Sequence, residues 1–175
     1  MAFARWMLVS ALVVTALLVE LTVLPLLHLP GAVPDLLTVT VIAIGFAAGP
    51  IRGAVTGFAA GLLLDLVPPA DGLLGLSAVM LVTVGYLAGL LGAEADRSPF
   101  STVGLTSVLS AIVVLGQAMV GGIVLDPRVS WDRVPGLVLT AAAYAAVLAA
   151  FVVPTVGALW RRVEPPTPRY DVGRL

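Results

Sequence analysis

The sequence contains no cysteine, no lysine and no asparagine, and its only histidine is His28. The absence of cysteine excludes disulfide bonds, thiolate metal sites and cysteine-based catalysis. A lone histidine without further ligands at metal-binding spacing does not predict a zinc site. Charged residues of both signs together make up only 11% of the chain, and aromatic residues only 6%. Polar chemistry therefore has few residues on which to depend.

Apolar residues dominate the chain instead. They make up 60% of the sequence and give a mean hydropathy of +1.12, well beyond the composition of a soluble domain. These values predict an all-α, polytopic transmembrane helical bundle, in which 175 residues leave no room for a separate soluble domain. The net charge is −1 and no basic stripe is present, so nucleic acid is not expected as a partner. No motif predicts a cofactor or a metal ion.

Proline, glycine and charged residues divide the chain into six apolar segments, which we expect to cross the membrane within one domain, residues 1–160. They run from Trp6 to His28, Asp35 to Ala48, Ile51 to Val67, Gly72 to Gly92, Ser101 to Leu125 and Val134 to Trp160. The second and third are short for a hydrocarbon core of ~30 Å. They fit a hairpin at Gly49-Pro50, short spans in a thinned region of the membrane, or one long broken helix. Residues 161–175 predict a disordered cytoplasmic tail.

Arginine residues near the ends of these segments predict the orientation. With both termini inside a bacterial cytoplasmic membrane, the inner side holds Arg5, Arg52, Arg97, Arg161 and Arg162. The outer side then holds only Arg128 and Arg133, as the positive-inside rule requires. In this orientation the carboxylates of the first four segments and their turns lie in the outer half: Glu20, Asp35, Asp65 and Asp71.

Glycine recurs at every fourth position from Gly45 to Gly61, and the next step of this series is Asp65. Spacing of four keeps residues near one stripe of a helix, so Gly53, Gly57 and Gly61 predict a face that another helix can approach closely. Four residues advance about 400° around the helix, which is more than one full turn, so the stripe winds slowly around the helix. We expect its inner part to pack within the bundle and its acidic outer end to receive a partner.

Glu20 is the deepest carboxylate. An ionisable group at such a depth needs a partner, a proton or water. Gln117 and Tyr144 fall at a similar height on the fifth and sixth segments, so we expect a buried polar cluster of Glu20, Gln117 and Tyr144. Two interpretations stay open: Glu20 ties the helices together as a neutral acid, or it takes part in proton coupling or ligand contact.

Asp35, Asp65 and Arg52 also have competing interpretations. Asp35 follows Pro34 at the start of the second segment, where it fits a helix N-cap as well as a functional group. Asp65 lies at the end of the third segment, where the helix dipole disfavours an anion, so capping does not explain it and a specific contact is favoured. Arg52 is most simply a determinant of orientation.

Signatures of enzymes are absent from the sequence. It lacks Gly-x-Ser-x-Gly, His-Glu-x-x-His and a P-loop, and it also lacks the Tyr-Asp and Gly-x-Gly-Asp motifs of intramembrane aspartyl proteases. We therefore expect a protein that is not an enzyme.

Residues 34–92 contain an ordered series of short motifs. The series is Pro34-Asp35-Leu36-Leu37, Gly49-Pro50-Ile51-Arg52-Gly53, Gly57-Phe58-Ala59-Ala60-Gly61-Leu62-Leu63-Leu64-Asp65, Gly72-Leu73-Leu74-Gly75 and Val84-Gly85-Tyr86-Leu87-Ala88-Gly89. In order and spacing it resembles the MreD family of rod shape-determining proteins. The residues that match the family are Asp35, Arg52, Gly53, Gly57, Gly61, Asp65 and Gly75.

The resemblance implies a six-span bundle similar to the S components of energy-coupling-factor transporters. It also implies a non-enzymatic scaffold for lateral peptidoglycan synthesis, bound to an MreC-like single-span protein and acting beside MreB, the elongation glycosyltransferase and a penicillin-binding transpeptidase. On this hypothesis Asp35 and Asp65 meet in an outer polar recess that receives the partner. Two alternatives remain: the substrate-binding membrane subunit of a vitamin transporter, and a transporter of membrane lipid or its precursors.

Overall fold

The computed structural model describes residues 2–27, 31–67, 74–95, 98–125 and 130–164, and all regular structure in these ranges is helical. The expectation of an all-α chain is confirmed for them. The elements are α1 (Ala2–Thr22), the 3₁₀ turn η1 (Leu24–Leu27), α2 (Leu36–Ala48), α3 (Pro50–Leu66), α4 (Leu76–Leu90), α5 (Gly92–Ala95), α6 (Pro99–Ile123) and α7 (Val134–Val163).

The helices begin and end near the predicted boundaries, with two differences. The α-helical part of the first segment ends at Thr22, before Pro25, which cannot donate a backbone hydrogen bond. Helix α7 continues past Trp160 to Val163, so Arg161 and Arg162 are helical and do not belong to a disordered tail. The rest of the predicted tail, residues 165–175, and the outer turn with Asp71 lie outside the described residues.

Three apolar helices are long enough to cross a membrane, which indicates a membrane protein. They comprise Phe3–Leu26, Pro99–Ile123 and Val134–Val163. Helices α2 and α4 are apolar but have only 13 and 15 residues, about 20 and 22 Å of helix. Of the six segments that we expect to cross the membrane, three therefore form helices of full length and three form shorter helices. That all six cross the membrane stays a prediction.

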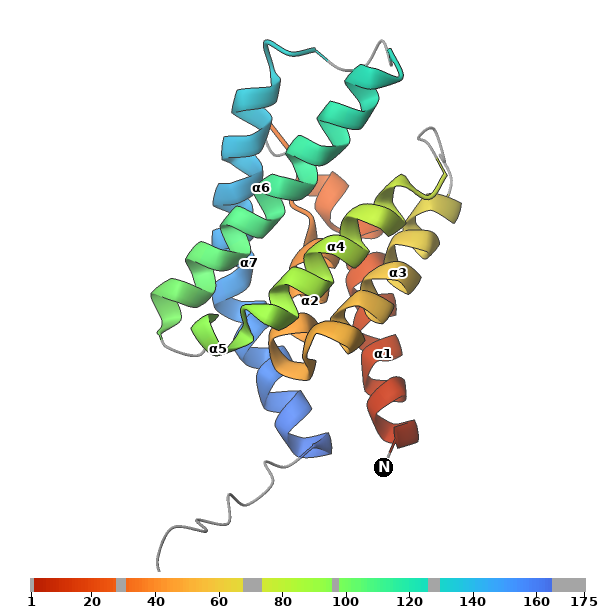
Figure 1. The fold of residues 1–175 in the computed structure, drawn as a ribbon, viewed down its shortest axis with the longest axis vertical. Helices are drawn as coiled ribbons and strands as arrows, with labels where there is room; N and C mark the ends of the chain where they lie inside the picture. Colours follow the sequence, from red (N-terminus) through yellow and green to blue (C-terminus); the bar gives the residue numbers. More distant parts are fainter. Residues whose placement is uncertain (1, 28–30, 68–73, 96–97, 126–129, 165–175) are drawn as a thin grey trace, which may run out of the picture.

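Helix α2 lies at the centre of the bundle, between α1, α3, α4 and α7 (Figure 1). Every residue from Leu37 to Gly45 is buried, on all sides of the helix. A helix that is hydrophobic on every face is stable only when other elements enclose it. Its composition thus explains its central position.

The outer surface is apolar as well. Helix α3 exposes Ile51, Val55, Phe58, Leu62 and Leu66 along one face, and α7 exposes Val147 and Phe151. Large apolar faces of this kind are rare on soluble monomers and mark contact with lipid or with another protein. The bundle is consequently hydrophobic both inside and outside, as expected for a membrane protein.

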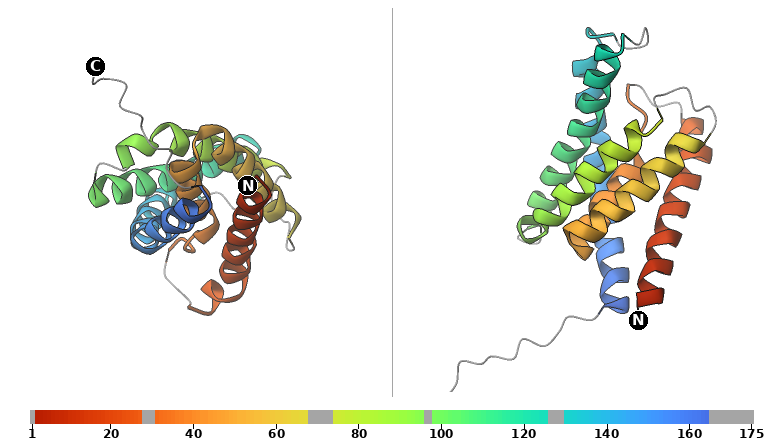
Figure 2. Two further views of the ribbon diagram at one scale, coloured as in Figure 1. Left: turned by 90° about the horizontal axis from the view of Figure 1, so that it is seen from below. Right: turned by 45° about the vertical axis from the view of Figure 1, so that its right-hand side comes forward.

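The start of α1 and the end of α7 lie at the same end of the bundle, here called the terminal end (Figure 2). Arg5 near the start of α1 and Glu164 just after α7 are joined by an ion pair of 3.4 Å between Nη1 and Oε1. The opposite end, here called the far end, contains the start of α2, the end of α3 and the start of α4. The side of the membrane on which the termini lie stays a prediction.

Helices α3 and α4 pack against each other backbone to backbone. A Cβ atom added to Gly53 would lie 2.2 Å from the carbonyl oxygen of Gly85, and one added to Gly57 would lie 2.1 Å from that of Leu81. At Gly61 the same atom would lie 2.4 Å from the Cα of Ala78. Since the opposing atoms belong to the backbone, no side-chain movement would make room.

All three glycines of the stripe on α3 therefore pack against the backbone of α4. The expectation of internal packing is met at Gly53 and Gly57, and also at Gly61, toward the far end, where we had expected a partner. Gly85 and Gly89 of α4 complete the interface, because a Cβ on Gly85 would meet the Gly53 oxygen at 2.3 Å and one on Gly89 would meet the Pro50 nitrogen at 2.2 Å.

This interface yields a prediction for stability. Gly57→Ala should destabilise the folded protein by about 2 to 3 kcal/mol, because the added methyl group forces the backbones of α3 and α4 apart. Gly104→Ala on α6 is the matched control, since a Cβ there meets no atom within 4 Å. Unfolding of both variants in mixed detergent micelles measures the difference. Equal stability of the two would contradict the packing described.

Candidate functional site

Asp35 caps the N-terminus of the central helix α2. Its Oδ1 accepts a hydrogen bond of 2.6 Å from the backbone N–H of Thr38, and its Oδ2 accepts one from the Thr38 hydroxyl. The first backbone N–H groups of a helix have no partner within the helix, and an acidic side chain satisfies them while matching the positive end of the helix dipole. The structural interpretation of Asp35 as an N-cap therefore matches its position.

Glu20 reaches the same helix end from α1. Its Oε2 accepts a hydrogen bond of 2.7 Å from the backbone N–H of Leu37. Two carboxylates, one from α1 and one from the residue before α2, thus serve adjacent N–H groups. This contact fixes the far end of α1 against the central helix and agrees with the hypothesis that Glu20 ties helices together.

Asp65 performs the same task for another helix. It lies in the last turn of α3, and its Oδ2 accepts hydrogen bonds from the backbone N–H groups of Gly75 at 2.8 Å and Ala78 at 3.4 Å. Gly75 is the N-cap of α4, has a φ of 90°, and carries no side chain for capping. The carboxylate of α3 supplies the missing acceptor.

Our expectation for Asp65 needs correction on this point. Capping was set aside because Asp65 sits at the C-terminal end of its own helix, but the helix that it caps is the next one. The specific contact that we expected exists, and it is internal to the chain. Asp65 is not among the residues that line the cavity containing Asp35, although its neighbour Leu64 is. A recess shared by Asp35 and Asp65 stays a prediction.

A cavity of about 320 Å³ lies beside the two caps of α2. Its polar lining consists of Glu20, Asp35, Ser110 and Gln117, and the remaining walls are mostly aliphatic. Ser110 is only 4% exposed, and its buried Oγ has no hydrogen-bond partner among the described residues. A hydroxyl, an amide and two carboxylates around one space suit ordered water or a small polar ligand.

The predicted polar cluster is partly assembled around this cavity. Glu20 and Gln117 line it together, although they come from α1 and α6. Tyr144 does not line it, whereas its neighbours Ala141 and Ala145 on α7 do. Ser110 was missed by sequence reasoning, because nothing distinguishes one serine in an apolar helix until the helices are placed together. The described residues include no group of three or more histidine or acidic side chains that would hold a metal ion.

Arg52 lies at the terminal end, where it joins α3 to α7. Its Nη1 donates a hydrogen bond of 2.8 Å to Oε2 of Glu164, and its guanidinium lies 5.5 Å from the ring centroid of Trp160. Arg52 and Glu164 are 112 positions apart in the sequence, and no local pattern relates them. Arg52 thus has a structural contact in addition to any effect on orientation.

Comparison of the chain with protein-family models, with curated proteins and with solved structures finds no match.

The capping role of Asp65 is open to a direct test. Asp65→Ala should lower the free energy of unfolding by about 1 to 2 kcal/mol, because two N–H groups of α4 lose their acceptor. Asp65→Asn should cost less, since the amide oxygen still accepts a hydrogen bond. Asp132→Ala, at an exposed turn residue, should change stability by less than about 0.5 kcal/mol. A neutral effect of Asp65→Ala would show that the contact does not hold α4.

Proposed function

We propose that this protein is a non-enzymatic integral membrane scaffold of the bacterial cell-elongation machinery that binds an MreC-like single-span protein. The observation that carries the proposal is that the residues of the MreD-like motif series form one structural unit. Asp35 caps α2, Asp65 caps α4, and Gly53, Gly57 and Gly61 bring α3 against α4. The residues of the motif thus hold α2, α3 and α4 together through contacts within the chain.

A rigid unit of this kind suits a platform for other proteins. The unit formed by α2, α3 and α4 is held by contacts at both ends and along the glycine stripe, so its lipid-facing surfaces have a fixed geometry. Fixed surfaces favour binding, because little conformational freedom is lost when a partner docks. MreB, the elongation glycosyltransferase and a penicillin-binding transpeptidase are the further proteins that this role implies.

We propose that the bundle has six crossings, in an arrangement like that of the S components of energy-coupling-factor transporters. The short helices α2, α3 and α4 are accommodated by local thinning of the bilayer and by their polar caps. The terminal end faces the cytoplasm, because it contains Arg5, Arg52, Arg161 and Arg162. The protein then belongs to the bacterial cytoplasmic membrane.

The partner needs a surface other than the glycine stripe, since α4 occupies that surface. A groove of about 630 Å³ lies between α6 and α7, with α2 as its floor. Small residues form much of its α7 wall, including Ala149, Ala150 and Gly157. Small residues allow the backbones of two membrane helices to approach closely.

A helix in this groove would also complete the enclosure of α2. Phe46 and Ala47 of α2 line the groove and are half-buried, whereas Leu37 to Gly45 are fully buried. The single transmembrane helix of the partner is our proposed occupant, because its apolar side chains would cover this remaining part of the central helix. This assignment replaces the acidic outer recess as the expected docking site.

The groove can be blocked without disturbing the fold. A Cβ on Gly157 would meet only Nη1 of Arg161, at 3.4 Å, so a larger side chain there projects into the groove. Gly157→Leu should reduce recovery of a co-expressed one-span, coiled-coil partner about tenfold, as expected from losing roughly 1.4 kcal/mol of binding. Detergent co-purification with a tagged chain measures the recovery.

The control is Gly136→Leu, also on α7, where an added Cβ meets no atom within 4 Å and which does not line the groove. This variant should recover as much partner as the wild type. Failure of the wild-type chain to recover the partner would contradict the scaffold function. If Gly157→Leu recovers as much partner as the wild type, only the assignment of the groove as the docking site is contradicted, and the scaffold function is not.

The cavity beside α2 favours one alternative function, the substrate-binding subunit of a vitamin transporter. Its volume of about 320 Å³ suits a small polar molecule, as does the Ser110 hydroxyl, which has no hydrogen-bond partner within the described ranges. Native mass spectrometry of the purified chain discriminates between the two functions. A stoichiometric small molecule that is lost in Ser110→Ala and Gln117→Ala would favour the transporter subunit over the scaffold.

A further inference from the structure

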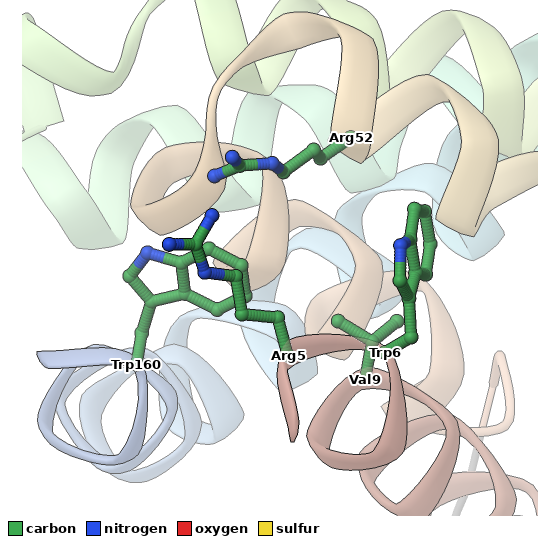
Figure 3. Close-up of a pocket in the computed structure, with 5 residues that line it drawn as sticks. All are labelled: Arg5, Trp6, Val9, Arg52 and Trp160. Atoms are coloured by element: carbon green, nitrogen blue, oxygen red, sulfur yellow. The ribbon is translucent and has the colours of Figure 1, made fainter. Parts of the chain in front are cut away.

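A second polar site lies at the terminal end, where α1, α3 and α7 meet. A cavity of about 100 Å³ is lined by Arg5, Trp6, Val9, Arg52 and Trp160 (Figure 3). The two guanidinium groups lie near each other beside Trp160, and Trp6 stands on the other side of the cavity. None of the functions considered above uses this cavity.

The charges around this cavity are unbalanced. Arg5 and Arg52 share a single carboxylate, that of Glu164, through Nη1 atoms at 3.4 and 2.8 Å. Among the residues that the structure describes, two cations facing one anion leave a net positive charge at the cavity. The cavity therefore has the electrostatics of an anion site.

The hydrogen-bond donors of the cavity are incompletely used. Each guanidinium carries about five N–H donors, and Glu164 accepts through only two oxygens. The Nε of Arg5 is buried and has no hydrogen-bond partner among the described residues. A buried donor without an acceptor is unfavourable, so an anion that bonds to Nε would remove this penalty.

Phosphate is the anion that this geometry suits. Its tetrahedral oxygens accept from two guanidinium forks at once, which a second carboxylate does less well. The surroundings indicate that the phosphate belongs to a lipid. Tryptophan is enriched at membrane interfaces, and the exposed Phe3 and Met7 beside Trp6 on α1 provide an apolar path for acyl chains.

We propose that this cavity binds the phosphate of an anionic phospholipid headgroup. Basic pockets between membrane helices commonly recognise such headgroups. The excess positive charge selects against zwitterionic lipids, because their ammonium group would approach Arg5 and Arg52. The bound lipid joins α1, α3 and α7 at the terminal end in addition to Glu164. The proposal requires the chain to lie in a membrane and does not depend on the scaffold function.

The test uses the delipidated full-length chain in detergent and native mass spectrometry. Phosphatidylglycerol should be retained at least about tenfold better than phosphatidylcholine with the same acyl chains, a difference of roughly 1.4 kcal/mol. Equal retention of the two lipids would overturn the proposal. Inorganic phosphate forms a separate arm: displacement of phosphatidylglycerol by an equal concentration of inorganic phosphate would show that free phosphate, and not a lipid, is the ligand.

Variants locate the site. Arg5→Gln and Arg52→Gln should each reduce retention of phosphatidylglycerol about tenfold, whereas Arg162→Gln, an exposed arginine of the same end that does not line the cavity, should change it less than about twofold. Equal effects of all three would overturn the assignment to this cavity. Size-exclusion chromatography of each variant reports folding.

Glu164→Gln keeps the test decisive where an arginine variant fails to fold. It retains both guanidinium groups and removes the carboxylate that competes with the phosphate. We expect tighter retention of phosphatidylglycerol in this variant, whereas a cluster that serves only as an internal ion pair would gain nothing. Equal or weaker retention in folded Glu164→Gln would therefore contradict the proposal.

Discussion

The contact on which the rest of the structure depends is the approach of α3 to α4 with no side chain between them. Gly53 and Gly85 face each other, and Gly57 and Gly61 face the backbone of Leu81 and Ala78. In lipid there is little hydrophobic driving force between helices, so close packing of backbones and hydrogen bonds hold them together. Because α4 lies tightly against α3, the two helices together form a wall that α2 can pack against.

The positions of the acidic residues follow from this arrangement of helices. Helices α2 and α4 both begin toward the far end, and the N–H groups at the beginning of each helix need acceptors from outside that helix. Glu20 and Asp35 serve α2, and Asp65 serves α4. The acidic character of one end of the bundle thus results from the direction of two short helices, and the arginine cluster at the other end joins the first and last helices.

Much of the fold was predictable from local patterns, but the sites depended on contacts that sequence does not reveal. Proline and glycine marked the helix boundaries, Asp35 could be identified as a cap, and the four-residue glycine spacing indicated close packing. The partner of Asp65 was not predictable, because Asp65 accepts hydrogen bonds from the start of another helix, whose N-cap lies ten residues later. Arg52 and Glu164 are 112 positions apart, and Ser110 resembles any other serine in an apolar helix.

The central claim is that the closed α3–α4 unit leaves the groove between α6 and α7 for a single-span partner. Since the chain has no cysteine, one introduced cysteine reports on one surface. Ala150→Cys lies in the groove and is exposed, and Phe58→Cys lies on the exposed face of α3. Labelling of membranes with a permeant maleimide should be suppressed by the co-expressed partner at position 150 and unchanged at position 58. Equal labelling at position 150 with and without the partner would contradict the account.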